Sequence, residues 1–587
     1  MGSGRQLDSS GDSHVIELIL LLAFFLLFAA LPASARPQES GSALSDQGAN
    51  VTANVKALYD SGQWDAVLEA IPESLENPPA ELQFYRGLAL ARLQRWAEAR
   101  SAFEAGLARN PRDIRFLEEL AGVEYMQNQF SRAKRYLSRA LSLDPSDDYA
   151  GNFLASIYFL EGNLEAALVH WNRAGKPVLS DLSFRGAEDL NPALLDHAFQ
   201  FTLGSEWLRN QFLTTNARLE ALNVCSQMRF DLEQQSEDAF QLAFRCNERG
   251  TSGAYKWQWL ASLFRGAPYQ EIYPEFYNLN HTAWNWISAF RWDDQKRLVH
   301  SETTAPLRND PQWQYRIYLE GRNENWNLTG TYLPGMSNPA ALNLEKAAFG
   351  AELRSIVTGR WSWSAGVEYS YRRMRNVDGF SSQAADFLTG GSGVAYRTRV
   401  ERSLIRIPER RFTLDSSAAG EFGTFFARPL GGFARIGGDL RSKWFPRARG
   451  DDYEMEARLR ASGTLGALPF DELFMLGFDR DNELWMRGHP GLRAGQKGRA
   501  PLGRDDLLAN WDVAKKVYSA PFISLALGPF VDTGKITDRS GYFGSPDWLA
   551  DAGIQAKIRV FGNFEFVLGY GRDLRSGRGS FYNGVWP

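Results

Sequence analysis

The C-terminal part of the chain, from about Trp257 to Trp586, alternates apolar and polar residues with a period of two. Residues 313–320 read Trp-Gln-Tyr-Arg-Ile-Tyr-Leu-Glu, and residues 453–460 read Tyr-Glu-Met-Glu-Ala-Arg-Leu-Arg. Because successive side chains of a strand point to opposite faces, one face is aromatic and aliphatic and the other is charged. A soluble β-sandwich would show the same alternation, but with shorter strands and fewer arginines. The pattern predicts a transmembrane antiparallel β-barrel of about 16 strands over residues 251–587.

Residues 51–176 carry a different, helical pattern that repeats every 34 residues. The repeated positions are Gly87, Ala121 and Ala155; Ala99, Ala133 and Ala167; Phe103, Leu137 and Trp171; and Pro111 and Pro145. Small residues let paired helices approach closely, a large apolar residue fills the space between pairs, and proline ends the second helix. This register resembles the tetratricopeptide repeat, with generic helical hairpins as the alternative. Such an α-helical solenoid presents a concave surface to a protein or peptide.

Residues 177–250 mix strand and helix patterns. A strand is expected over 178–184, two helices within 191–222, and then two alternating strands separated by a polar turn at 234–238. The apolar faces of the last two strands consist of Met228, Phe230 and Leu232, and of Phe240, Leu242 and Phe244. The order β-α-α-β-β resembles a POTRA module, the periplasmic domain that precedes certain outer-membrane barrels. Another small α+β domain is the alternative.

The chain has two cysteines, Cys225 and Cys246, and both fall in this predicted hairpin. If Leu232 faces Phe240, Ser226 lies opposite Cys246 and Cys225 is one residue out of register. A disulfide then requires a bulge or a frayed strand end. An oxidising compartment favours the bond, and two buried free thiols are the alternative.

The longest apolar run lies near the N-terminus, from Val15 to Pro32, and Ala33-Ser34-Ala35 follows it. This pattern predicts a signal peptide over residues 1–35 and a linker over 36–50, with an uncleaved membrane anchor as the alternative. After Pro37 no apolar run reaches the roughly 18 residues that a spanning helix needs. Any later membrane crossing is therefore expected to use strands.

Composition narrows the function classes. The 587 residues have a net charge of -4 and a pI near 6.0, which gives no electrostatic footprint for nucleic acid. The 18 Trp, 21 Tyr, 38 Phe and 53 Gly residues suit a membrane barrel with aromatic girdles. The six histidines are scattered without metal-ligand spacing, and no nucleophile elbow or phosphate-binding loop is found. We therefore expect no enzymatic activity, no cofactor and no metal.

Two motifs indicate a family. Met486-Arg487-Gly488-His489 lies in a Gly-rich loop, and Phe530-Val531-Asp532-Thr533-Gly534 follows in a strand pattern. Together they resemble the arginine-bearing loop and the F-x-D-x-G strand of the BamA/TpsB-like superfamily, also called bacterial surface antigen barrels. A strand at 507–512 carries Asp512 where the family has an acidic residue. The sequence departs from the family where His489-Pro490 replaces an aromatic residue, which leaves the packing of the loop open.

The resemblance implies a lock inside the barrel. Arg487, with Gly488 beside it, is expected to enter the lumen and to pair with Asp532 of the strand that ends at Gly534. Asp512 is expected to be a second acceptor. A guanidinium between two carboxylates would fix the loop. The alternative is a solvent-exposed loop arginine and a strand aspartate that binds water.

The resemblance also implies a function. We expect an outer-membrane translocase or insertase whose N-terminal domains lie in the periplasm. The repeats would bind polypeptide clients and periplasmic proteins, and the barrel would contact outer-membrane lipid. A weak closure between the first and last strands could template insertion. An exopolysaccharide-export porin with a tetratricopeptide scaffold is the alternative, and a surface-lipoprotein translocator is a third hypothesis.

Overall fold

A computed structural model describes residues 45–71, 78–186, 190–235, 239–249, 259–260, 263–328, 340–380, 387–388, 390–426, 431–447, 452–520, 523–539, 541–545, 547–560 and 564–586. The predicted signal peptide lies outside the described residues. Helix α2 (Ser45–Asp60) begins inside the segment expected to be a linker, so that part of the prediction is wrong. No helix of the described ranges is both long and apolar enough to cross a membrane. The chain divides into two compact units, Met1–Pro111 and Arg112–Pro587.

The first unit contains the helices α2, α3 (Trp64–Ala70), α4 (Ala80–Arg92) and α5 (Trp96–Arg109). Gly87 of α4 faces Phe103 of α5, whose ring is fully buried. A Cβ atom at position 87 would lie 2.4 Å from that ring. The smallest residue of the repeat is thus required where the two helices of a pair approach most closely.

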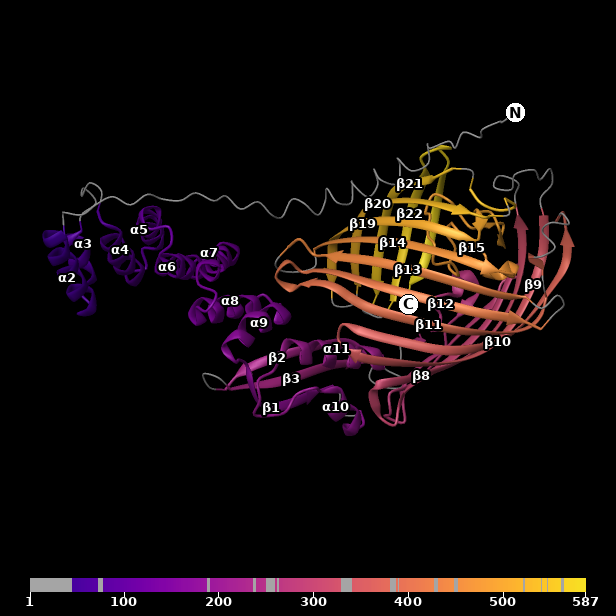
Figure 1. Cartoon of the computed structure of the whole chain (residues 1–587), viewed down its shortest axis with the longest axis horizontal. Coiled ribbons are helices and arrows are strands. Elements are labelled where there is room, and N and C mark those ends of the chain that lie inside the picture. The colour runs from indigo at the N-terminus through magenta and orange to yellow at the C-terminus, as the bar shows by residue number, and fades with distance from the viewer. Residues whose placement is uncertain are drawn as a thin grey trace, which may run out of the picture. The chain divides into compact units, whose positions relative to one another are not determined.

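The second unit begins with α6 (Ile114–Met126), α7 (Phe130–Leu143), α8 (Asp148–Leu160) and α9 (Leu164–Trp171). Ala121, Ala133, Ala155 and Ala167, four of the repeated small positions, are fully buried. Asp113 and Asp147 cap α6 and α8 by accepting hydrogen bonds from the backbone N–H groups of Arg115 and Ala150. Figure 1 shows these helices in successive antiparallel pairs.

A small α+β domain follows, made of β1 (Val178–Arg185), α10 (Pro192–Ala198), α11 (Arg209–Leu222), β2 (Cys225–Gln234) and β3 (Ala239–Glu248). Its sheet has the order β1-β3-β2, in which β1 is parallel and β2 antiparallel to β3. Trp207, Phe230 and Phe244 pack together in an aromatic core beneath the helices. We call residues 178–249 the POTRA-like domain.

The hairpin register of this domain differs from the predicted one. Leu232 pairs with Leu242 and not with Phe240, which lies opposite Gln234. The observed pairing sets Phe230 opposite Phe244. Because the shift is of two residues, every side chain stays on the face that the pattern predicted, and the alternation alone does not distinguish the two registers. The ladder sets Met228 opposite Cys246 and, beyond a register shift between Cys225 and Gln227, Cys225 opposite Glu248. Cys225 and Cys246 nevertheless form a disulfide, with Cα atoms 5.5 Å apart.

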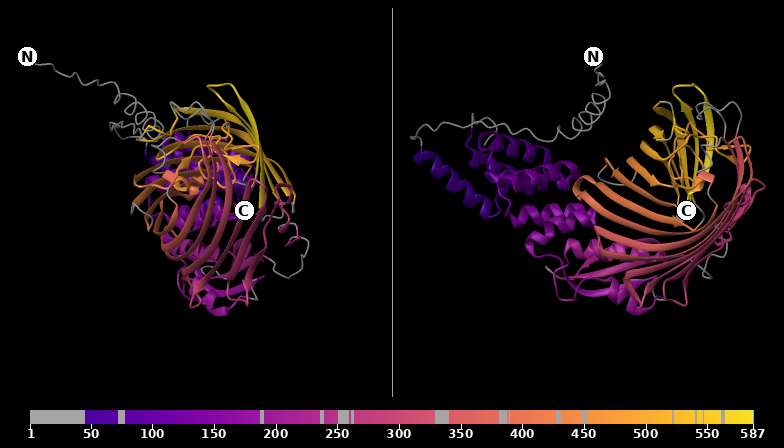
Figure 2. Two further views of the ribbon diagram at one scale, coloured as in Figure 1. Left: turned by 90° about the vertical axis from the view of Figure 1, so that its right-hand side faces the viewer. Right: turned by 45° about the vertical axis from the view of Figure 1, so that its right-hand side comes forward.

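The rest of the chain forms an antiparallel barrel sheet, as predicted. Its wall strands are β4 (Glu271–Ile272), β5 (Glu275–Leu279), β6 (Trp284–Trp292), β7 (Lys296–Leu307), β8 (Asp310–Leu328), β9 (Ala340–Thr358), β10 (Trp361–Asp378), β11 (Gly391–Ile407), β12 (Phe412–Phe425), β13 (Gly432–Trp444), β14 (Tyr453–Gly466), β19 (Asp505–Ala520), β20 (Ile523–Thr537), β21 (Leu549–Val560), β22 (Phe564–Asp573) and β23 (Gly579–Trp586). Two further short strands of the same sheet, β16 (Leu492–Arg493) and β17 (Gln496–Lys497), belong to the loop between β14 and β19, so the sheet holds eighteen strand segments. Figure 2 shows the strands curving around this interior loop.

Consecutive wall strands are joined by antiparallel ladders from β5–β6 to β22–β23, and β14 pairs directly with β19. Because β4 and β5 both pair with β6, they act as one interrupted edge strand. Within the described residues, no paired register joins this edge to β23. We call the junction between β23 and β4–β5 the seam. The strand order is that of a closed barrel with β23 next to β4, but the described residues of these two edges have no residue-by-residue register.

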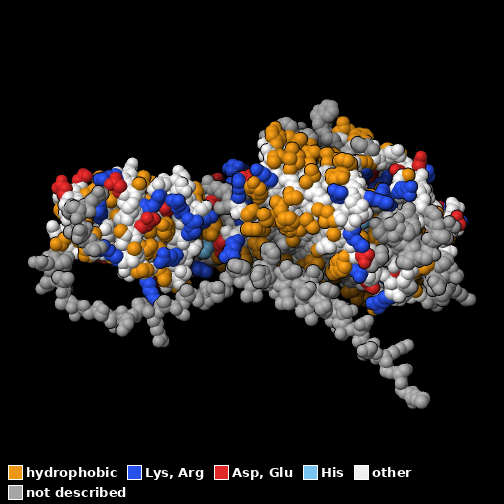
Figure 3. Space-filling view, turned by 90° about the horizontal axis from the view of Figure 1, so that it is seen from above, with side chains coloured by type: hydrophobic (Ala, Val, Ile, Leu, Met, Phe, Trp, Pro, Cys, Tyr) orange, Lys and Arg blue, Asp and Glu red, His pale blue; other side chains and the backbone are white. Residues whose placement is uncertain are grey.

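The two faces of the wall match the sequence pattern. On β8, Ile317 and Leu319 point outward and are 38% and 58% exposed, whereas Arg316 and Glu320 face the lumen. Figure 3 shows apolar side chains gathered over the outside of the barrel. Lumenal charges pair across strands, as Arg458 of β14 does with Asp439 of β13. The outer face therefore suits lipid and the inner face suits water.

One end of the barrel contacts the preceding helices. Arg218 of α11 donates to Gln312 near the β7–β8 turn over 2.8 Å, and the N–H of Gly359 in the β9–β10 turn donates to the hydroxyl of Thr214. Asn163, at the start of α9, donates to the carbonyl of Pro408 in the β11–β12 turn. The β14–β19 loop leaves from the opposite end of the barrel.

A buried histidine in α9 predicts a pH effect. His170 is 8% exposed and stacks on Tyr158. Burial, with a smaller effect of the Arg173 charge, lowers the pKa of His170 to about 4. Since the unfolded chain takes up this proton near pH 6.5, stability is full above pH 6.5 and falls progressively toward pH 4. The expected loss is about 3 kcal/mol.

The measurement is urea unfolding of the helices, followed by circular dichroism between pH 8 and pH 4.5. His170→Phe keeps an aromatic ring against Tyr158 and removes the titrating group, so the unfolding midpoint of this variant should fall less over this pH range. Equal pH slopes for the two proteins would contradict the assignment to His170.

Candidate functional site

The site is built on the loop between β14 and β19, residues 467–504, which we call the lumen loop. Most of its side chains from Leu468 to Phe478 are buried, so the loop folds back into the barrel. The Asn482 side-chain amide donates to the carbonyls of Met475 and Gly477 and closes a compact turn. The Trp485 indole donates to the Asn482 carbonyl over 2.7 Å. These bonds set the backbone that presents Arg487.

Arg487 makes a bidentate pair with Asp532 of β20. Its Nε donates to Oδ2 over 2.9 Å and its Nη2 donates to Oδ1 over 2.5 Å. The Arg487 backbone N–H also donates to Asp532 over 3.0 Å. The two side chains are 4% and 0% exposed. Three bonds to one buried carboxylate fix both the side chain and the backbone of the loop tip.

Three further polar side chains complete the surroundings of Arg487. Asp512 of β19 accepts from Nη1 over 2.5 Å, so the shorter carboxylate reaches the guanidinium. Gln555 of β21 accepts from the same nitrogen over 3.1 Å and donates to Asp512 over 2.6 Å. Asn510 donates to Asp532 over 2.7 Å. Residues on β19, β20 and β21 therefore all converge on one loop residue.

The glycines of the two motifs lie in close packing, which is tighter at Gly488 than at Gly534. A Cβ atom at Gly488 would lie 2.7 Å from the carboxylate of Asp551, to which the Gly488 N–H donates over 2.6 Å. At Gly534 a Cβ atom would lie 3.1 Å from Leu476 of the loop. Phe530 of β20 lies under Arg487, with the guanidinium carbon 3.8 Å from the ring centroid. The F-x-D-x-G strand thus supplies the ring of Phe530 and the carboxylate of Asp532 to Arg487, and the space at Gly534 to Leu476.

His489, the departure from the family motif, has partners of its own. Nδ1 lies 2.9 Å from Asp551 of β21, and Nε2 lies 3.5 Å from Asp573 of β22. The three side chains bring ligand atoms within 4.8 Å of one another, which is close enough for a metal ion. Each ring nitrogen faces a different carboxylate, however, whereas one ion would take one nitrogen together with both carboxylates. The geometry therefore favours a histidine bracketed by two carboxylates.

The first half of the lumen loop carries a set of acidic residues that no sequence motif predicted. Asp471 accepts from Arg372 of β10 over 2.7 Å, and Glu472 accepts from Arg372 and from Arg435 of β13 over 2.6 and 2.5 Å. Lys346 of β9 lies 3.2 Å from both carboxylates. These side chains are largely buried, so their charges compensate one another inside the barrel.

A second acidic pair lies farther along the loop. Asp479 and Asp481 meet Lys296 of β7 at 3.0 and 2.8 Å, and Asp481 also accepts from Arg291 of β6. The first half of the loop is thus acidic and pairs with the basic side of the lumen, whereas the Arg487–His489 tip pairs with acidic strands. This segregation of charge fixes the orientation of the loop. The sequence signal that could have indicated these pairs is the charged residues at alternate positions of the wall strands.

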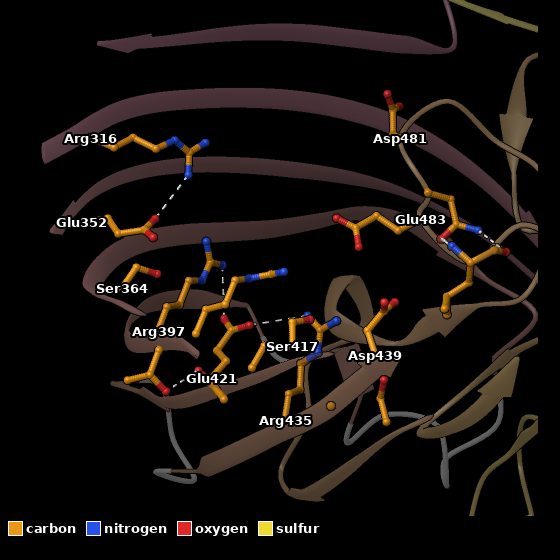
Figure 4. A pocket seen from close by; sticks show the side chains of 18 of the residues that line it. Arg316, Glu352, Ser364, Arg397, Ser417, Glu421, Arg435, Asp439, Asp481 and Glu483 are labelled. Carbon is orange, nitrogen blue, oxygen red and sulfur yellow. Dashed lines mark hydrogen bonds and ion pairs between the residues drawn. The ribbon is translucent and has the colours of Figure 1, made fainter. Parts of the chain in front are cut away.

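Beside the loop lies a polar cavity of about 940 Å³. Figure 4 shows Arg397, Glu421 and Arg435 of the wall pointing toward one another, with Asp481 and Glu483 of the loop on the far side. Glu421 lies 3.2 Å from Arg397 and 3.5 Å from Arg435. The described lumen therefore holds paired charges of both signs, a loop anchored on its walls and a polar cavity beside that loop.

Comparisons with known proteins give the following matches. Tetratricopeptide-repeat models match residues 52–114 and 90–157. Similar solved structures include BamA from Haemophilus ducreyi lacking POTRA domains 1-3, with 10% identity, 70% of this chain and 84% of that chain covered, and a TM-score of 0.40. CdiB from Escherichia coli and CdiB from Acinetobacter baumannii are 10% and 12% identical, cover 70% of this chain and 76% and 73% of those chains, and have TM-scores of 0.46 and 0.44. No curated protein matches the chain significantly. The predicted repeats are thus confirmed, and the N-terminal helices of this chain are tetratricopeptide repeats.

Proposed function

We propose that this chain is an outer-membrane barrel that inserts polypeptides into that membrane or moves them across it. The observation that supports this most is the buried three-bond pairing of Arg487 with Asp532. A passive pore needs an open lumen. Here a loop with charged anchors on opposite walls crosses the lumen beside the polar cavity, so we infer that passage of a chain involves movement of the loop or opening of the wall.

The strands of the wall are shortest at the seam, which supports a route for the polypeptide through the seam. Strands β8 and β9 have 19 residues each, whereas β22 and β23 have 10 and 8, and β5 has 5. A transmembrane strand needs roughly 9–11 residues, so the bilayer must thin or leave backbone exposed at the seam. An unpaired edge at this place is suited to receive an incoming strand.

The N-terminal parts suit the reception of a client. The repeats offer helical surfaces of the kind that bind extended chains. In the POTRA-like domain β2 is an edge strand whose described pairing is with β3 alone, so its outer edge can accept a strand by β-augmentation. We propose a periplasmic position for the N-terminal domains, because α9 and α11 contact the end of the barrel opposite to the entry of the lumen loop. The proposed role needs no catalytic step and no cofactor.

The test is quantitative proteomics of outer-membrane and secreted fractions from a deletion strain complemented with wild-type, Arg487→Ala or Arg354→Ala protein. Arg354 is also a lumenal arginine, but its side chain is 43% exposed and it pairs over 2.9 Å with Glu401, which is itself 39% exposed, so it is a matched control. Wild-type and Arg354→Ala should restore the proteome, and Arg487→Ala should not.

Extracellular polysaccharide is assayed on the same cultures, because the charged cavity would also suit a polysaccharide pore. Loss of polysaccharide with an intact proteome would replace the proposal with the export porin. Selective loss of surface lipoproteins would identify a lipoprotein translocator.

A further inference from the structure

The seam is the weakest junction in the barrel by backbone pairing. Strand β22 pairs with β23, and β4 and β5 pair with β6, but the described residues of β23 and β4–β5 share no ladder. Strand edges without hydrogen bonds separate easily unless other contacts hold them. Four consecutive residues of the lumen loop, Phe478–Asp481, contact both sides of this junction.

On the first-strand side the contacts are ionic. Asp481 accepts two hydrogen bonds from Arg291 of β6, over 2.8 and 3.0 Å. Asp479 is fully buried at its side chain and accepts two bonds from Lys296 of β7, both over 3.0 Å. Arg480 lies over the ring of Tyr269, just before β4, and 3.7 Å from Glu271 of β4. Residues 479–481 therefore hold three consecutive strands of this edge.

On the last-strand side the contact is apolar and backbone-mediated. The ring of Phe478 packs on Tyr582 of β23 with centroids 4.8 Å apart, in a cluster with Phe530 and Val567 of β22. The Phe478 N–H donates to the carbonyl of His489 over 2.8 Å, and Gly491 donates to the Phe478 carbonyl over 2.7 Å. Since His489 lies between carboxylates of β21 and β22, Phe478 is tied to three strands on this side.

We propose that Phe478–Asp481 form a strap that holds the first and last strands of the barrel together from the lumen, in place of a backbone ladder. Releasing this strap separates the edges. This deepens the proposed function, on which its last consequence rests: strap release is the step that exposes an edge to a polypeptide client. The holding role itself depends only on the contacts described above.

The experiment measures the width of the seam directly. Cys225 and Cys246 are disulfide-bonded and the described chain has no other cysteine, so introduced cysteines can be spin-labelled selectively. One label replaces Phe581 on β23 and the other replaces Val299 on β7, both exposed on the outer face. Distances are measured by pulsed electron spin resonance on the full chain in lipid nanodiscs. A second pair, Leu319 on β8 and Tyr396 on β11, reports an intact wall far from the seam.

Asp481→Asn and Phe478→Ala should each lengthen or broaden the seam distance by about one strand spacing, roughly 5 Å. The control is Asp471→Asn, which neutralises a carboxylate of the same loop that is more deeply buried than Asp481 (3% against 18% exposed) and whose partners Arg372 and Lys346 lie away from the seam. It should leave the distance unchanged. If Asp481→Asn also changes the distance of the reference pair, the seam distance is measured instead in Arg480→Gln, since the Arg480 side chain is only partly buried.

An unchanged seam distance in Asp481→Asn, in Phe478→Ala and in their double variant would overturn the strap. The same shift in Asp471→Asn would also overturn it, because general loosening of the loop would then explain the result. The distance measurement requires no polypeptide client. A widened seam together with an unaffected outer-membrane proteome would refute the proposed function and leave the strap standing.

Discussion

Arg487→Ala is expected to destabilise the barrel by about 3–5 kcal/mol, because it leaves the fully buried Asp532 with a charge and no cation. Asp532→Ala should have a similar effect, because it leaves the buried guanidinium of Arg487 without its main carboxylate partner. The double variant should be little worse than either single variant, because both remove the same interaction. Two quantities are measured. One is the temperature to which samples must be heated before electrophoresis for the folded band to disappear, and the other is the urea midpoint of unfolding in detergent.

Arg354→Ala is the matched control for this cycle. Its guanidinium is 43% exposed and makes an ion pair with a carboxylate that is itself 39% exposed, so its removal should change stability by less than about 1 kcal/mol. Additive losses in the Arg487 and Asp532 variants would show that the two residues act independently. Equal losses for Arg354→Ala and Arg487→Ala would show that any lumenal arginine matters equally.

Removing the disulfide of the POTRA-like domain is expected to have the second large effect. Cys225 and Cys246 are 21 residues apart, and a cross-link over a loop of this length restricts the unfolded chain by about 3 kcal/mol. The double variant Cys225→Ser/Cys246→Ser should therefore open this domain to protease at lower urea concentration. The measurement is limited proteolysis of the full chain, with fragments assigned by mass spectrometry.

The controls separate the domain from the barrel. Wild-type protein treated with reductant should behave like the double variant, and reductant should not change the double variant further. The free energy of unfolding of the barrel should stay within about 1 kcal/mol of wild type, because the Cys225–Cys246 disulfide lies outside the barrel wall. A protease pattern that is the same with and without the disulfide would contradict a stabilising role for it.

Much of the fold follows from local pattern. The 34-residue register predicted the repeats because buried small residues such as Ala121 and Ala155 recur at a spacing set by the helix pair. The alternation at 313–320 predicted which side chains face lipid, since the pleat of a strand leaves no choice once one face is apolar. The β-hairpin shows the limit of such reasoning, because placing Leu232 opposite Phe240 was wrong by two residues.

The sequence by itself determined the helical repeats and the alternating wall strands, and its resemblance to a known family implied the pairing of Arg487 with Asp532 and Asp512. Only the tertiary structure decided the partners of Asp471, Glu472, Asp479, Asp481 and His489. Lys296 and Asp479 are 183 residues apart, and nothing in the spacing of either predicts the other. The physical reason is that such pairs form only after the strands have curved around the lumen and the loop has entered it. Short-range periodicity records which face of an element is buried, whereas the meeting of distant charges depends on how the faces close on one another.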